Sequence, residues 1–165
     1  MNHAYLLTGG NLGDRTENLK KAEIAIGAQA GKVLRLSSLY ETAAWGTENQ
    51  PDYLNQAMLV ETGLSATALL HTLLAIEKQL GRLRQEKYDA RIIDIDILFF
   101  NNDVVHTREL IIPHPHLQNR RFVLVPMAEI APAFRHPLLQ KNISELLTNC
   151  ADPLDVKKFY AASGV

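Results

Sequence analysis

The chain has 165 residues, of which 47% are hydrophobic, and its 17 basic and 18 acidic residues give a formal net charge of −1. This composition excludes a disordered chain and predicts a single domain over residues 1–165. Because the charge is nearly balanced, there is no broad positive field, and we expect neither a nucleic-acid nor a membrane partner. The single cysteine, Cys150, excludes an internal disulfide and a multi-cysteine zinc site.

The distribution of apolar residues bears on the location of the protein. No apolar run approaches the ~20 residues that a membrane-spanning helix needs. The first ten residues hold only a short apolar run that ends at Gly9 and Gly10, so we expect no secretory signal. We therefore predict a cytoplasmic protein, and we take it to be a monomer.

The first part of the chain alternates predicted strands and helices. Residues 4–8 form a short apolar run that predicts a strand, and residues 13–30 carry apolar side chains at helical spacing. Alternating residues predict a second strand at 32–40. After a loop, residues 53–62 predict a third strand.

The second part begins with a clear helix signal. Ser65 is the predicted N-cap of a helix over residues 66–81, which carries a leucine and isoleucine stripe. A polar loop leads to a fourth predicted strand at 91–100. Six of the seven prolines lie in the last third of the chain, so we expect that part to be rich in loops, with short helices near 119–130 and 143–149.

The order of the first six elements indicates the fold class. Strand, helix, strand, strand, helix, strand is the split βαβ order of ferredoxin-like proteins. We therefore predict an α+β protein in which helices pack on an antiparallel β-α-β-β-α-β sheet.

The fourth predicted strand, "RIIDIDILFF", contains two aspartates one residue apart. On a strand, Asp94 and Asp96 point to the same face about 6.6 Å apart, while Ile93, Ile95 and Ile97 point to the other face. A half-buried strand with one wet face explains the alternation, but it does not favour Asp over Thr or Lys. Magnesium prefers carboxylate oxygens, and a bound cation would convert the repulsion between the two carboxylates into binding.

Basic residues precede this strand. Arg82, Arg84, Lys87 and Arg91 lie on the polar loop that leads into it. Such a run is usually a solvated charged loop. Next to two carboxylates, however, arginines are what a nucleoside triphosphate with its magnesium requires, because the guanidinium fork matches phosphate oxygens.

The segment "TGGNLGD", residues 8–14, lies between a predicted strand and a predicted helix. Its glycine spacing does not match the dinucleotide-binding fingerprint, and the chain contains no P-loop motif. We interpret the segment as a tight structural turn.

Two further groups of residues are candidates for binding. His114 and His116 could, with His106, ligate zinc, but no third ligand stands at a familiar spacing. Prolines hold this stretch extended, so the two imidazoles could instead hydrogen-bond a phosphate. Tyr53 and Asn55 share one face of a predicted strand. A tyrosine ring there is usually packing, but the ring and amide could also stack on a flat heterocycle and bind its edge.

Taken together, these segments resemble the 6-hydroxymethyl-7,8-dihydropterin pyrophosphokinases of folate biosynthesis. The similarity extends over nearly the whole chain, through "TGGNLGD", "SSLYET", "QPDYLNQA", "IEKQLGRLR", "RIIDIDILFF" and "IPHPHLQNRRFVLVPMAEIAP". The resemblance implies transfer of the β,γ-diphosphate of ATP to the pterin hydroxymethyl group, which leaves AMP. ATP would be the co-substrate, and two magnesium ions would be the cofactors.

The resemblance also implies roles for individual residues. The magnesium ligands would be Asp94 and Asp96. The pterin-binding residues would be Thr42, Ala43, Ala44, Trp45, Tyr53, Asn55 and Phe122. The ATP-binding residues would be Glu77, Arg84, Tyr88, Ile97, His114 and Arg120. The catalytic residues would be Arg82, Arg91 and Asp96.

Some residues depart from the family pattern. Ala44 stands at a frequent proline position, Asp89 at the position of a small residue, and Glu109 at a position that is basic in some relatives. Two other classes stay open on the residues alone. One is a nucleotide-binding regulatory module on the same frame without catalysis, and the other is a zinc hydrolase.

Overall fold

The structure is a computed structural model that describes residues 1–43, 51–81 and 92–160. The described part contains a main sheet with the strand order β5-β1-β4-β3-β8, in which β2 also pairs with β4. Its strands are β1 (Asn2–Gly10), β2 (Lys32–Leu36), β3 (Leu39–Thr42), β4 (Tyr53–Thr62), β5 (Asp94–Phe100) and β8 (Val156–Phe159). The other elements are β6 (Val105–His106), β7 (Ile111–Ile112), α1 (Arg15–Gln29), α2 (Ala66–Gln79), the 3₁₀ helix Leu117–Asn119, α3 (Arg121–Ile130) and α4 (Ile143–Thr148).

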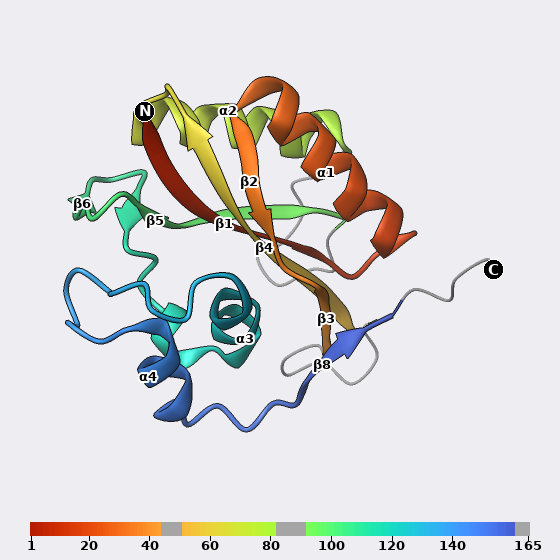
Figure 1. Cartoon of the computed structure of the whole chain (residues 1–165). Coiled ribbons are helices and arrows are strands. Elements are labelled where there is room, and N and C mark those ends of the chain that lie inside the picture. Colours follow the sequence, from red (N-terminus) through yellow and green to blue (C-terminus); the bar gives the residue numbers. More distant parts are fainter. Residues whose placement is uncertain (44–50, 82–91, 161–165) are drawn as a thin grey trace.

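The two faces of the sheet are covered by different helices. Figure 1 shows α1 and α2 on one face and α3 and α4 on the other. The first face buries a cluster that includes Leu19, Ile26, Leu69, Leu73 and Ile76 from the two helices. The second face buries a separate cluster to which α3 and α4 contribute. Burial of apolar area on both faces is the main stabilising contribution to this sheet.

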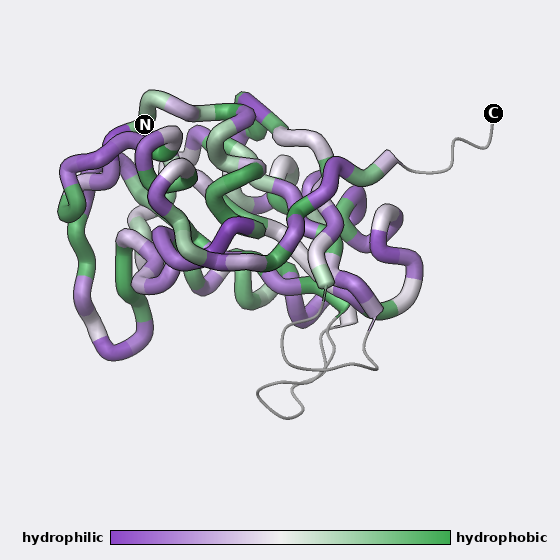
Figure 2. Tube along the Cα trace, turned by 90° about the horizontal axis from the view of Figure 1, so that it is seen from below, coloured by the Kyte–Doolittle hydropathy of each residue, from purple (hydrophilic) through white to green (hydrophobic). Residues whose placement is uncertain are grey.

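The view from below (Figure 2) gives the hydropathy of each residue along the chain. Hydrophobic and hydrophilic stretches alternate along most of the trace in Figure 2. The apolar residues of α3 and α4 that pack inward are Val123, Leu124, Met127, Ile130, Ile143 and Leu146. This alternation is expected of helices with one buried stripe and one exposed side.

The predicted α+β class, with helices packed on an antiparallel sheet, is confirmed. Strand β1 is antiparallel to both β4 and β5, and β4 is antiparallel to β2, as the split βαβ order requires. Helices α1 and α2 lie within the predicted ranges. The Ser65 hydroxyl accepts a hydrogen bond from the Ala68 N–H at 3.2 Å, so Ser65 is the predicted N-cap.

Several details differ from the prediction, which also did not include the short strands β6 and β7. Strand β1 continues through Gly9 and Gly10 instead of ending at Thr8, because both glycines remain paired with β4. The predicted strand at 32–40 is two strands. Strand β8 was not predicted at all, because a four-residue segment with two central lysines has no apolar period and becomes a strand only by pairing with β3.

The break between β2 and β3 lies at Ser37 and Ser38. The Ser37 N–H donates to the Ala57 carbonyl at 2.9 Å, and the Ala57 N–H donates to the Ser37 hydroxyl, also at 2.9 Å. The hydroxyl thus takes the place of a backbone carbonyl in the ladder. The chain can therefore shift its course here without leaving a buried N–H unpaired.

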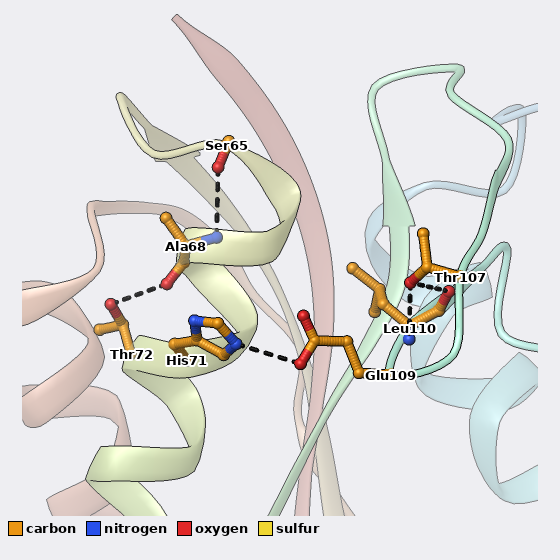
Figure 3. Close-up of polar contacts among 7 residues, drawn as sticks. All are labelled: Ser65, Ala68, His71, Thr72, Thr107, Glu109 and Leu110. Carbon is orange, nitrogen blue, oxygen red and sulfur yellow. Dashed lines mark hydrogen bonds and ion pairs between the residues drawn. The ribbon is translucent and has the colours of Figure 1, made fainter.

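A small hairpin, β6–β7, packs beside α2 (Figure 3). His71 of α2 lies 3.2 Å from the Glu109 carboxylate in the turn of this hairpin. The Thr107 hydroxyl accepts from the Leu110 N–H at 3.1 Å and fixes the turn, while Leu110 is buried in the core. Because both His71 and Glu109 are more than half exposed, we expect this contact to contribute little stability.

None of the helices in residues 1–43, 51–81 and 92–160 combines the length and the apolar content that a bilayer crossing requires.

Candidate functional site

Two rows of residues cross three strands and define the candidate site. One row joins Asn55 of β4, Gly9 of β1 and Asp94 of β5, and the next joins Ala57, Leu7 and Asp96. Residues that are paired across a sheet project to the same face. Asp94, Asp96 and Asn55 therefore share the face that α3 and α4 cover, because Leu7 and Ala57 lie in that cluster.

The isoleucines of β5 take the opposite face, as predicted. Ile93, Ile95 and Ile97 are buried in the cluster beneath α1 and α2. The two aspartates are only half-buried. One strand thus anchors the sheet on its apolar side and presents two carboxylates on its other side.

Gly9 allows the amide of Asn55 to lie across β1. A Cβ atom built on Gly9 would come within 2.2 Å of Asn55 Oδ1 and 3.3 Å of the Leu54 carbonyl oxygen. Real side chains do not approach so closely, so the Asn55 amide occupies the place that any other residue at position 9 would fill. The amide is buried, and on the far side of Gly9 lies Asp94.

The end of the β3–β4 ladder adds a hydroxyl and an aromatic ring. Thr42 is paired with Tyr53, and Tyr40 is paired with Asn55. Thr42 is only 3% exposed, yet its hydroxyl oxygen has no hydrogen-bond partner among the described residues. A buried polar atom without a partner is costly, so this hydroxyl is suited to bind a ligand. Ala43, which follows, is exposed.

His114 lies beside β5, to which its backbone is hydrogen-bonded. Its N–H donates to the Leu98 carbonyl at 3.0 Å, and the His116 N–H approaches the His114 Nδ1 atom at 3.4 Å. Burial, followed by the nearby charges of Arg120 and His116, lowers the pKa of His114 to about 4, although Asp94 acts in the opposite direction. The imidazole is therefore neutral at pH 7. With Nδ1 as the acceptor, Nε2 carries the proton and is the donor.

Arg120 and Phe122 complete this side of the site. Both are partly buried at the start of α3, and the Arg120 guanidinium carbon lies 5.8 Å from the centre of the Phe122 ring. This cation–π contact with the ring favours a defined orientation of the Arg120 guanidinium. The charge of Arg120 is one of the causes that lower the pKa of His114.

Glu77 and Ile97 lie on the α2 side of β5. Glu77 is 1% exposed, and its Oε2 accepts a hydrogen bond from the Ile95 N–H at 2.7 Å. Because β5 is the edge strand of the described sheet, this N–H points away from β1, and Glu77 satisfies it. Ile97 is buried among apolar residues.

Several predicted site residues fall outside the described part of the chain. These are Ala44, Trp45, Arg82, Arg84, Tyr88 and Arg91.

The chemistry of the two aspartates fits magnesium. Proteins usually bind magnesium through one or two carboxylates, and phosphate oxygens of a substrate complete its coordination. Asp94 and Asp96 offer two carboxylates on one half-buried strand face. The zinc alternative gains no support. Within residues 1–43, 51–81 and 92–160, no three or more His, Cys, Asp or Glu residues form a group that could hold a metal. His106 instead lies exposed on β6.

The comparison with protein families identifies the chain. The profile of the 7,8-dihydro-6-hydroxymethylpterin-pyrophosphokinases matches residues 5–132. The chain belongs to this family.

Individual pyrophosphokinases are similar over most of their length. The 2-amino-4-hydroxy-6-hydroxymethyldihydropteridine pyrophosphokinase of Synechocystis sp. is 44% identical over 140 residues, which cover 84% of this chain and 71% of that protein. The enzyme of the same name from Bacillus subtilis is 42% identical over 130 residues, or 78% of each chain. The Aquifex aeolicus enzyme is 38% identical over 141 residues, or 86% of this chain and 88% of its own.

Solved structures show the same fold. The wild-type HPPK-DHPS of Plasmodium falciparum with STZ-DHP superposes with a TM-score of 0.73 at 18% identity, over 89% of this chain. The matched part is 43% of that longer chain, so this chain spans less than half of it. At this identity the likeness concerns the fold alone.

Two residues near the site were not predicted to have a role in it. Gly9 lies within the segment 8–14 that we interpreted as a structural turn, and Arg15 directly follows it. The close approach of Gly9 to Asn55 and the contacts of Arg15 with distant residues depend on the three-dimensional structure. The glycine on a strand, a position where glycine often marks a close approach, was the available signal.

Proposed function

We propose that the chain transfers the β,γ-diphosphate of ATP to the hydroxymethyl group of 6-hydroxymethyl-7,8-dihydropterin and releases AMP, as a step of folate biosynthesis. The observation that carries this proposal is the row Asn55–Gly9–Asp94, which puts an amide and a carboxylate on one face of the sheet. The family match supports the same reaction.

The pterin is proposed to bind at the end of the β3–β4 ladder. The Thr42 hydroxyl and the Asn55 amide offer donors and acceptors to its polar edge, with Ala43, Ala44 and Trp45 nearby. The rings of Tyr53 and Phe122 are proposed to stack on its two faces. The buried Thr42 hydroxyl without a described partner supports this placement, because a ligand would satisfy it.

The triphosphate is proposed to lie along β5. Asp94 and Asp96 would hold two magnesium ions, which when bound neutralise phosphate charge. Neutral His114 donates from Nε2 to a phosphate oxygen, and Arg120 supplies its guanidinium fork. We propose the same kind of contact for Arg82, Arg84 and Arg91, with Tyr88 and Ile97 near the nucleotide and Glu77 between the substrates.

The proposed reaction is a direct displacement at the β-phosphorus. The hydroxymethyl oxygen of the pterin forms a bond to this phosphorus, while the bond to the oxygen bridging the α- and β-phosphorus breaks. AMP leaves with that oxygen, and Asp96 accepts the hydroxyl proton. The protein contributes mainly positioning and charge neutralisation, which are the main sources of catalysis in phosphoryl transfer.

The test of this proposal is product analysis. The protein is incubated with ATP, magnesium and the hydroxymethyl dihydropterin, and nucleotides and pterins are separated and quantified. We expect AMP and pterin diphosphate in equal amounts, and no AMP when 6-methyl-7,8-dihydropterin, which has no hydroxyl, replaces the substrate. ADP would indicate an ordinary kinase instead, and an absence of turnover would favour a regulatory nucleotide-binding module.

A single domain over residues 1–165, a monomer and a cytoplasmic location stay predictions. They are consistent with this proposal but are independent of it.

A further inference from the structure

Arg15, the first residue of α1, contacts two segments that are distant in the sequence. Its Nη1 atom donates to Glu41 Oε2 at 2.6 Å and to the Asp52 carbonyl at 2.9 Å. Its guanidinium carbon also lies 5.2 Å from the centre of the Phe159 ring of β8. One side chain thus joins β3, the residue before β4, and β8.

These contacts flank the Thr42–Tyr53 pair. Glu41 immediately precedes Thr42, and Asp52 immediately precedes Tyr53. Because side chains alternate along a strand, Glu41 and Thr42 project to opposite faces. Arg15 therefore binds this corner of the sheet from the side of α1, behind the face that carries Thr42 and Tyr53.

The ladder itself ends at this corner. Thr42–Tyr53 is the last described pair between β3 and β4. The last pair of a ladder opens more readily than the pairs inside it, because it has a neighbour on one side only. Arg15 adds a cross-link around that pair, because it contacts Glu41, which lies inside the ladder, and the Asp52 carbonyl, which lies beyond its end.

The turn that precedes Arg15 contributes a second side chain. The Asn11 amide nitrogen donates to the Pro51 carbonyl at 3.1 Å, and Asn11 is buried. The carbonyls of two successive residues, Pro51 and Asp52, therefore accept from the side chains of Asn11 and Arg15, in the segment that connects β1 to the first turn of α1. This segment thus fixes the start of β4 as well as turning the chain.

The chemistry of arginine suits this position. Its planar guanidinium can donate to a carboxylate and a carbonyl while one face lies against an aromatic ring, which a lysine ammonium does less well. The side chains of Arg15 and Glu41 are only 22% and 31% exposed, so water screens their attraction less than at an open surface.

We propose that Arg15 is a positioning residue for the pterin. By fixing the end of β3 and the start of β4, Arg15 holds Thr42 and Tyr53 at the separation that the pterin ring requires. It does so without contacting the ligand itself. The inference rests on the proposed function for the identity of the ligand. It adds a residue from α1 to a site that is otherwise formed by β3, β4, β5 and α3.

The test compares Arg15→Met, Arg15→Lys and the control Arg35→Met in steady-state kinetics. Arg35 is a suitable control because it also donates to a backbone carbonyl, that of Ile130, at 2.8 Å, but from β2. We expect Arg15→Met to raise the KM for the pterin roughly tenfold, with the KM for ATP changed less than about twofold. Arg15→Lys should recover part of the loss, and Arg35→Met should leave both KM values unchanged.

An unchanged pterin KM in Arg15→Met would overturn the inference, as would an equal rise in both KM values, since that indicates a general loss of structure. If Arg15→Met does not fold, Glu41→Gln replaces it, and the pterin KM must rise selectively there too. Failure of the proposed function is distinguishable, because wild-type protein would then form no AMP at all.

Discussion

Gly9 connects the two halves of the candidate site because it has no side chain. The Asn55 amide lies over it from β4, and Asp94 is paired with it from β5. From the sequence, the two glycines after the first strand predicted only a turn. The spacing of residues 94 and 96 predicted their shared face, but the contact of Gly9 with a residue 46 positions away depends on the strand order, which local sequence does not encode.

Replacing Gly9 by alanine should displace the Asn55 amide. The new Cβ would lie 2.2 Å from Asn55 Oδ1, so the amide must move, and we expect pterin affinity to fall by about 1–3 kcal/mol. Calorimetric titration with the pterin measures the loss. The matched control is Gly27→Ala in α1, where a Cβ meets nothing within 4 Å. Wild-type affinity in Gly9→Ala would show that the amide does not bind the pterin.

Removal of the Asn55 amide tests the same contact directly. We expect Asn55→Ala to weaken pterin binding by about 1–3 kcal/mol, because the polar edge of the ligand loses its partner in a buried place. Binding of a non-hydrolysable ATP analogue should change little. Equal losses for both ligands in calorimetry would count against placing Asn55 at the pterin.

His136 makes folding stability depend on pH. It is buried, its Nδ1 accepts from the N–H groups of Leu138 and Leu139 at 3.1 and 3.0 Å, and burial lowers its pKa. Below about pH 6.5 the His136 imidazole therefore becomes protonated in the unfolded chain while it stays neutral in the folded chain. The free energy of unfolding consequently falls as the pH decreases.

Urea denaturation at pH 7 and pH 5 measures this effect. His136→Asn keeps a side-chain acceptor but cannot become protonated, so its free energy of unfolding should fall less between these pH values than that of the wild type. Part of the pH dependence should remain, because the pKa of His114 is also lowered. An identical decrease in both proteins would contradict this account of His136.

At the scale of elements, a carboxylate attaches α3 to the sheet. Glu129 accepts from the Ser38 N–H at 3.0 and 3.1 Å, from the Ser38 hydroxyl at 3.1 Å and from the Tyr40 hydroxyl at 2.5 Å. Burial raises the pKa of Tyr40, and its hydrogen bond to Glu129 raises it further. Burial also acts to raise the pKa of Glu129, but the hydrogen bonds from Tyr40 and Ser38 outweigh it, and the pKa is lowered.

Glu129→Gln should loosen this attachment. The amide keeps one acceptor oxygen but loses its charge and one oxygen, so we expect the free energy of unfolding to fall by about 1–2 kcal/mol at pH 7. Chemical denaturation measures the decrease. Asp155→Asn is the control, because the side chains of the Asp155–Lys157 ion pair are about three-quarters exposed, so this pair should contribute little. A variant as stable as the wild type would show that these hydrogen bonds contribute nothing net.

The elements differ in how far the sequence predicts them. Helices α1 and α2 have caps and apolar stripes within their own residues, so local pattern was sufficient. The division of the strand at 32–40 depends on the Ser37 contacts with Ala57, and β8 depends on β3. Such elements arise from pairing between distant segments, and for the same reason the contacts of Arg15 could not be predicted.

At the scale of the whole molecule, the two faces of the sheet differ in how completely they are buried. One face is covered by α1 and α2 over a continuous apolar cluster. The other is covered by α3 and α4 around a second cluster, beside which the two aspartates stay only half-buried. The candidate site can thus carry repelling carboxylates because the apolar face of the same strand stabilises the fold.

The most direct test of the account is binding of a non-hydrolysable ATP analogue in the presence and absence of magnesium. The proteins compared by calorimetry are wild type, Asp94→Asn, Asp96→Asn and, as a control, Asp103→Asn in the exposed turn after β5. Asparagine is nearly isosteric with aspartate and removes repulsion, so all variants should fold as the wild type does.

Magnesium should strengthen binding of the analogue to wild type and to Asp103→Asn. In Asp94→Asn and Asp96→Asn this gain should fall by more than about tenfold in affinity, because a carboxylate ligand of the cation is lost. If both site variants keep the full magnesium-dependent gain, the two aspartates do not hold the cation, and the proposed site on β5 is wrong.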